Sequence, residues 1–74
     1  MYRDVMLHVS QDLSTDALRS LGAHVDRRMG VKVKAHASSK PHLFFFEADL
    51  DRAPPHAIVE AVRDYGCDAK LVDL

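Results

Sequence analysis

The middle of the chain reads VKVKAHASSKPHLFFFEA at residues 31–48. Apolar and polar side chains alternate over residues 31–38, which is typical of a half-buried strand, and the turn-forming residues 38–41 follow. After the turn comes an apolar run at residues 43–46, and because Glu47 is unlikely to be buried, Phe44 and Phe46 are predicted to point inward. The pattern predicts a hairpin whose strands cover residues 31–37 and 42–48.

An amphipathic helix is predicted on each side of this hairpin. Apolar residues recur at intervals of three and four between Ser14, a suitable N-cap, and Gly30, a suitable stop. A second stripe of this kind runs through residues 54–65, where two prolines suit the first helical turn and Gly66 ends the pattern.

Strand patterns also precede the first helix, at residues 5–9, and follow the second, at residues 68–74. Right-handed crossovers then predict one α+β domain over residues 1–74, a ferredoxin-like βαββαβ sandwich. Its four-stranded antiparallel sheet has the strand order 4-1-3-2, with both helices on one face. The predicted core comprises Val5, Val9, Leu21, Val25, Val33, Phe44, Phe46, Ile58, Val62 and Leu71.

This topology brings three loops to the same end of the molecule. They are the loop after the first strand, the hairpin turn and the turn before the last strand. We therefore expect residues 10–14, 38–42 and 66–67 to be neighbours in space.

The composition is that of an ordinary globular domain. Hydrophobic residues make up 47% and charged residues 28%, with a formal net charge of -1, which excludes a disordered or low-complexity chain. No segment is long and apolar enough to span a bilayer, and residues 1–10 lack the features of a signal peptide, so a cytoplasmic location is expected. No catalytic triad, phosphate-binding glycine loop or paired-carboxylate motif occurs, and we predict no enzymatic activity.

A basic segment at residues 27–40 allows a nucleic-acid interpretation, since four-stranded sheets of this topology bind RNA by stacking bases on aromatic side chains such as Phe45. The aromatic motifs of such domains are missing, however. Lysines on an edge strand also have a simpler role in discouraging pairing with other chains. Nucleic-acid binding is not expected.

Two stretches resemble the heavy-metal-associated domains of copper chaperones, mercury-binding proteins and metal-transporting ATPases. Residues 58–71, IVEAVRDYGCDAKL, are similar to that family's last helix, glycine turn and last strand. Ala17 stands fourteen residues before the valine of Gly30-Val31, as the family's second metal-binding cysteine usually does. The resemblance covers nearly the whole chain and implies the same fold.

The family's metal-binding residues have been replaced. The resemblance places Ser14 and Ala17 where the family has its Cys-x-x-Cys pair, and neither residue is a good ligand for a soft metal. It also marks Asp12 and Gly66 as binding-loop positions. Cys67, which follows Gly66, is the one cysteine of the chain, so it makes neither an internal disulfide nor a two-thiolate site.

Two hypotheses follow for this small soluble binding module. In the first, Cys67 and His42 bind a soft or borderline metal ion such as Cu or Zn, with Asp12 or a second chain completing the site. In the second, the chain is a metal-independent docking or regulatory module that kept the family's interaction surface. Both predict a protein partner or self-association. The N-terminus of the first helix lowers the pKa of a nearby thiol while acidic neighbours raise it, so the direction of the shift at Cys67 stays open.

Overall fold

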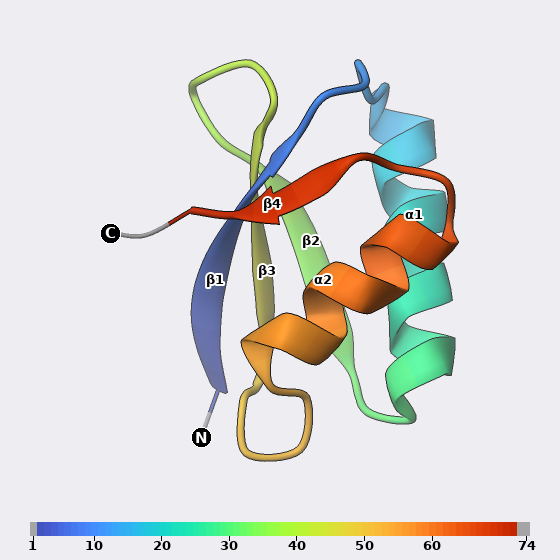
Figure 1. Ribbon diagram of the computed structural model, residues 1–74, viewed down its shortest axis with the longest axis vertical. Coiled ribbons are helices and arrows are strands. Elements are labelled where there is room, and N and C mark those ends of the chain that lie inside the picture. Colours follow the sequence, from blue (N-terminus) through green and yellow to red (C-terminus); the bar gives the residue numbers. More distant parts are fainter. Residues whose placement is uncertain (1, 73–74) are drawn as a thin grey trace.

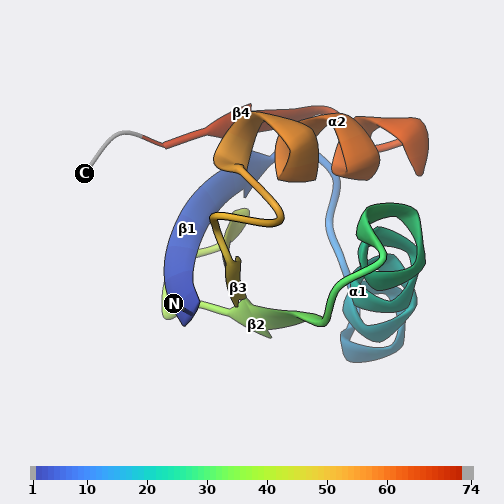
Figure 2. The same cartoon turned by 90° about the horizontal axis from the view of Figure 1, so that it is seen from below.

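The computed structural model describes residues 2–72. In chain order its elements are β1 (Tyr2–Val9), α1 (Thr15–Met29), β2 (Val33–Ala37), β3 (Leu43–Asp49), α2 (Pro55–Asp64) and β4 (Ala69–Leu71), as drawn in Figure 1. The strands form one antiparallel sheet in the order β2-β3-β1-β4. Both helices lie on the same face of the sheet (Figure 2). The predicted ferredoxin-like α+β fold and its strand order are confirmed.

Alternate residues of the two central strands point to opposite faces of the sheet. Leu7 of β1 pairs with Phe44 of β3, and both side chains are buried beneath the helices. The next pair, Met6 and Phe45, is only partly buried and points away from the helices. We call the side of the sheet that carries Met6 and Phe45 the open face.

One apolar core lies between the sheet and the helices. Its largest fully buried side chains are Phe46, Leu7, Leu21, Ile58, Val9, Val25 and Val62. The predicted core is confirmed except at Leu71, which is 50% exposed. Leu71 pairs with the buried Leu7, so the register directs it to the helix side. The prediction is wrong because β4 is a short edge strand that runs out beyond α2 (Figure 1).

The caps of α1 form as the sequence predicts. Ser14 is the N-cap, and Gly30 ends the helix in the left-handed conformation with φ 69°, donating its N–H to the carbonyl of Asp26. The end of α2 differs from expectation. Tyr65, the last residue of the predicted apolar stripe, is 43% exposed and lies against the His24 ring of α1, with ring centroids 5.2 Å apart.

The limits of all four strands differ from the predictions, β3 only by a shift of one residue from 42–48 to Leu43–Asp49. β1 begins at Tyr2, three residues early, because the long β3 gives it partners as far as Asp49. β2 begins at Val33 rather than at residue 31 because its pairing with β3 starts at Ala48. The alternation also predicts Ala37 on the core side; it pairs with the buried Phe44 and so has that orientation, but at the end of the edge strand it is exposed. β4 covers only part of residues 68–74, and residues 73–74 lie outside the described part.

Within residues 2–72, no helix combines the length and the apolar character that crossing a membrane requires.

Candidate functional site

The three loops predicted to meet do so at one end of the sheet. The backbone N–H of Val9 donates to the carbonyl of His42 at 2.8 Å, and that of Ser10 donates to the carbonyl of Asp68 at 3.0 Å. The β1–α1 loop therefore contacts the β2–β3 loop on one side and the α2–β4 turn on the other. Figure 1 shows it between these two segments. We call this cluster the loop end.

Gln11 ties the α2–β4 turn to the rest of the loop end. Its side-chain Nε2 donates to the carbonyl of Gly66 at 3.3 Å, while its Oε1 accepts the N–H of Asp68 at 2.9 Å. The hydroxyl of Ser10 adds a bond to the Asp68 carboxylate at 3.2 Å. Gly66 has φ 106°, a conformation that side chains other than that of glycine rarely adopt. Gln11 is not among the predicted site residues. Its hydrogen bonds join two loops that are far apart in the chain, and such bonds leave no local sequence pattern.

Ser14 and Ala17 are joined by the first hydrogen bond of the α1 cap. The Ser14 Oγ accepts the backbone N–H of Ala17 at 3.0 Å, and the Ser14 carbonyl accepts the N–H of Leu18 at 2.9 Å. The serine hydroxyl thus satisfies an N–H that has no partner within the helix. The chemistry at these two positions is that of a helix cap.

Cys67 lies in the α2–β4 turn, partly buried against the apolar core. Its backbone N–H donates to the carbonyl of Val62 at 3.4 Å. Burial raises the pKa of the Cys67 thiol above the ordinary value of 9.0. The direction that the sequence left open is therefore set by desolvation, which favours the neutral thiol over the nucleophilic, metal-binding thiolate.

His42 lies next to the end of the β1–β3 pairing, and its side chain bonds to the backbone of β1. Its backbone has φ 67°, and its ring Nδ1 lies 2.9 Å from the carbonyl oxygen of Val9. Because a carbonyl oxygen only accepts, Nδ1 carries the proton and Nε2 is left for another partner. That Nε2 lies 3.4 Å from Oδ1 of Asp12, and the His8 ring lies 5.9 Å away, centroid to centroid.

Apart from Ser14 and Ala17 in the α1 cap, the predicted site residues fall into two groups at the loop end. His42 is close to Asp12, whereas the turn that contains Gly66 and Cys67 is bonded to Gln11 on the other side of the β1–α1 loop. Among residues 2–72, His, Cys, Asp and Glu side chains nowhere form a group of three or more that could hold a metal ion.

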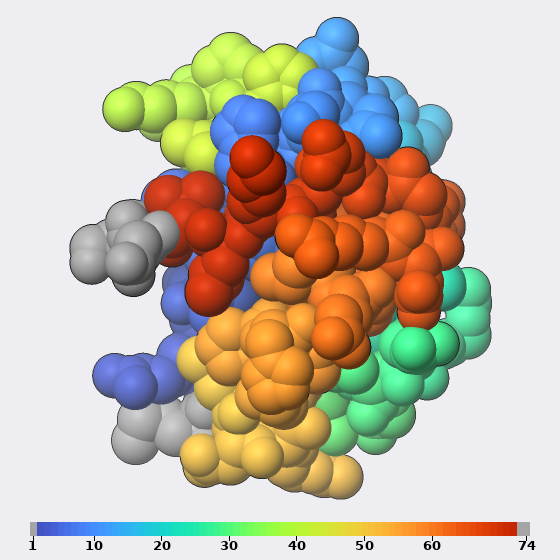
Figure 3. Space-filling view, viewed as in Figure 1, coloured from blue at the N-terminus to red at the C-terminus, as the bar shows by residue number. Residues whose placement is uncertain are grey.

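Three hollows on the surface of residues 2–72 bear on the site. One, of about 320 Å³, lies beside His42 and Asp12. A second, of about 380 Å³, lies on the open face between Met6, Phe45 and the β2–β3 loop, and its lining is mostly apolar. Figure 3 shows the surface hollowed between that loop and the end of β4.

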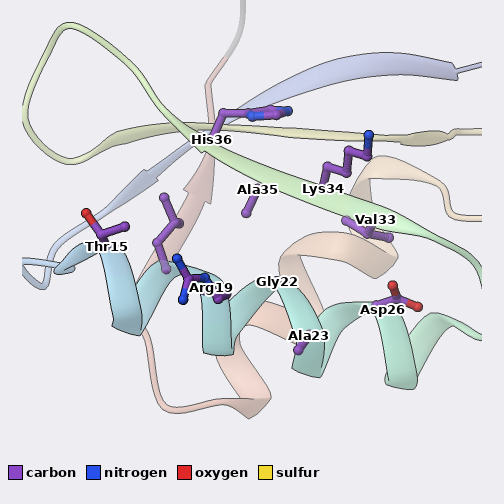
Figure 4. A pocket seen from close by; sticks show the side chains of 10 residues that line it. Thr15, Arg19, Gly22, Ala23, Asp26, Val33, Lys34, Ala35 and His36 are labelled. Atoms are coloured by element: carbon purple, nitrogen blue, oxygen red, sulfur yellow. The ribbon is translucent and has the colours of Figure 1, made fainter.

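The third hollow is a groove of about 380 Å³ between α1 and the edge strand β2. Figure 4 shows Val33 and Ala35 pointing toward α1, while Lys34 and His36 point away from it. The helix approaches the strand closely at Gly22, where a Cβ would lie 3.4 Å from the Cβ of Ala35.

The chain matches no model of a known protein family, and a search of curated proteins finds no significantly similar sequence. The resemblance to heavy-metal-associated domains stays a prediction.

Proposed function

We propose that the chain is a metal-independent protein-docking module of ferredoxin-like fold. The observation that carries this proposal is the hydrogen bond between Ser14 and Ala17, the two positions that the predicted resemblance matches to the cysteine pair of heavy-metal-associated domains. Both positions serve the stability of α1. A docking function needs neither of them as a ligand.

The state of the neighbouring turn also supports this function. Gln11 holds the backbone on both sides of Cys67, and the thiol itself is partly buried with a raised pKa. A thiol that is largely protonated at neutral pH is a weak metal ligand and a weak nucleophile. The loop end is therefore better suited to a fixed shape than to exchange of a soft metal.

The open face supplies a surface for docking. Met6 and Phe45 lie side by side across β1 and β3, partly exposed, beside the apolar hollow described above. Apolar side chains gathered on one face of a small domain are typical of protein contact sites.

A metal-linked function is the second candidate, and the orientation of His42 favours it. Histidine ligands usually donate the proton of the other ring nitrogen to a carbonyl or carboxylate, as Nδ1 of His42 does to Val9. The remaining Nε2 faces Asp12, whose carboxylate oxygen would be the second ligand. This version of the site uses His42 with Asp12 in place of the predicted pair of His42 with Cys67.

A Zn(II) titration of the reduced chain, followed by NMR, separates the two candidates. The docking proposal predicts weak binding, with no saturation near one equivalent. The metal-linked function predicts saturable shifts around His42 and Asp12 that Asp12→Asn and His42→Asn both abolish. Asparagine is the suitable replacement for His42 because it tolerates a positive φ. Saturable binding that Cys67→Ser alone abolishes would support the predicted site of Cys67 with His42 and contradict the docking proposal.

A further inference from the structure

Three cross-strand pairs on the open face form an ordered series along β1. Asp4 pairs with Glu47, Met6 pairs with Phe45, and His8 pairs with Lys70 of β4. All six residues belong to the side of the sheet that the helices leave uncovered. Along β1 the face is therefore acidic at one end, apolar in the middle and basic at the other end, and the exposed His36 of β2 lies beside Phe45 on the same face.

One further cation lies at the acidic end. Lys34 of β2 lies opposite Glu47 in the strand register, so a cation stands next to the Glu47 carboxylate on this face. Asp4 is exposed at the same level of the sheet. At the opposite end, His8 and Lys70 are both exposed. The difference in charge between the two ends is therefore carried mainly by Asp4 at one end and by Lys70 with His8 at the other.

We infer that the open face binds the open face of a second copy of this chain, around a two-fold axis that runs across the strands. Such an axis turns each strand end for end, so Asp4 of one copy comes to face the end of its partner that carries His8 and Lys70. Met6 and Phe45 lie near the axis and pack against their own counterparts. In a two-fold dimer every such contact occurs twice. An axis along the strands would instead bring the acidic ends together, and the repulsion disfavours it.

The edges of the sheet are less suited to self-association. β4 is three residues long, and the other edge strand, β2, carries Lys34 and ends in a loop that contains Lys40. Short strands and lysines both discourage edge-to-edge pairing. Face-to-face packing of two sheets buries apolar side chains without using those edges.

The test is a charge exchange followed by sedimentation velocity over a range of protein concentrations. The unmodified chain is expected to show a reversible monomer–dimer equilibrium. Asp4→Lys and Lys70→Glu should each weaken the dimer about ten-fold, since each places like charges together at two equivalent contacts. The double variant Asp4→Lys/Lys70→Glu should restore the affinity to within about three-fold. Glu60→Lys, the same charge change on the exposed side of α2, is the matched control and should have no effect.

A second measurement guards against variants that fail to fold. In the unmodified chain, amide chemical shifts of Met6 and Phe45 should change with protein concentration, while those of exposed residues on α1 and α2 should not. A chain that stays monomeric up to millimolar concentration, or a dimer insensitive to both charge reversals, would overturn the inference.

This inference rests on the proposed docking function, and the two fail in different ways. A monomeric chain that binds Zn(II) only weakly overturns self-association and leaves docking to a different protein. Tight metal binding overturns the docking proposal itself, whatever the oligomeric state.

Discussion

The Oγ of Ser14 accepts the backbone N–H of Ala17 at 3.0 Å, so the two positions that the sequence resemblance matches to a metal-binding cysteine pair are joined as a helix cap. A cap satisfies a backbone N–H that otherwise has no partner within the helix. Ser14 and Ala17 are three residues apart at the start of α1. This spacing suits a capping hydrogen bond, and it would equally suit a pair of metal-binding thiolates.

Ser14→Ala is expected to destabilise the chain by about 1 kcal/mol, the usual effect of losing a serine N-cap. The free energy of unfolding in urea measures it. Ser20→Ala, an exposed position within the same helix, is the control and should be neutral or slightly stabilising because alanine has the higher helix propensity. Equal stability of Ser14→Ala and the unmodified chain would show that the capping bond contributes nothing in solution.

Gln11→Ala should loosen the α2–β4 turn, because it removes both the bond to Gly66 and the bond to Asp68. Each of these exposed hydrogen bonds contributes at most about 0.5–1.5 kcal/mol, so the free energy of unfolding should fall by no more than two such contributions. Hydrogen exchange at the Asp68 amide should accelerate more than exchange in the core strands.

Gln11→Glu is the matched variant for these two hydrogen bonds. Its side chain keeps an acceptor for the Asp68 N–H but loses the donor to the Gly66 carbonyl. Its Asp68 exchange rate should lie between those of Gln11→Ala and the unmodified chain. If all three rates were the same, Gln11 would not hold the turn.

Cys67 should react slowly with iodoacetamide at mildly alkaline pH, because burial raises its pKa and lowers the thiolate fraction. The rate in the folded chain is expected to be well below the rate in denaturant. The raised pKa also makes the stability of the fold depend on pH. The buried neutral thiol contributes its full stabilisation below the ordinary pKa of 9.0, and this stabilisation is lost as the pH rises through the pKa of the folded chain. Cys67→Ser should therefore flatten the alkaline part of the stability profile. Alkylation that is faster in the folded state would contradict both expectations.

Much of the fold follows from the sequence because apolar spacing encodes it. The alternation over residues 31–37, the inward placement of Phe44 and Phe46, and the helical stripes together predict the observed topology and strand order. The errors occur where spacing is not enough. Leu71 has the register of a core residue, but an edge strand that runs beyond the helix layer leaves it exposed.

Less of the loop end followed from the sequence. The topology predicted that its three loops meet, and they do. It could not predict that Gln11 reaches across to the α2–β4 turn, or that His42 bonds to the Val9 carbonyl, 33 residues away in the chain. Side-chain bonds between distant loops depend on distances of a few tenths of an ångström, and no periodic pattern records them. The direction of the Cys67 pKa shift likewise needed the burial of that side chain.

The most direct test of the docking proposal is a Cu(I) titration of the reduced chain in competition with a dithiol chelator. Soft Cu(I) selects thiolates, so a chain with a single, partly buried thiol should lose the metal to the chelator. The double variant Ser14→Cys/Ala17→Cys supplies the missing pair on the same helix turn and should retain Cu(I) under the same conditions, which shows that the assay and the fold are competent. Retention by the variant and loss by the unmodified chain is the predicted result. One-to-one Cu(I) binding by the unmodified monomer that withstands the chelator would contradict the metal-independent function.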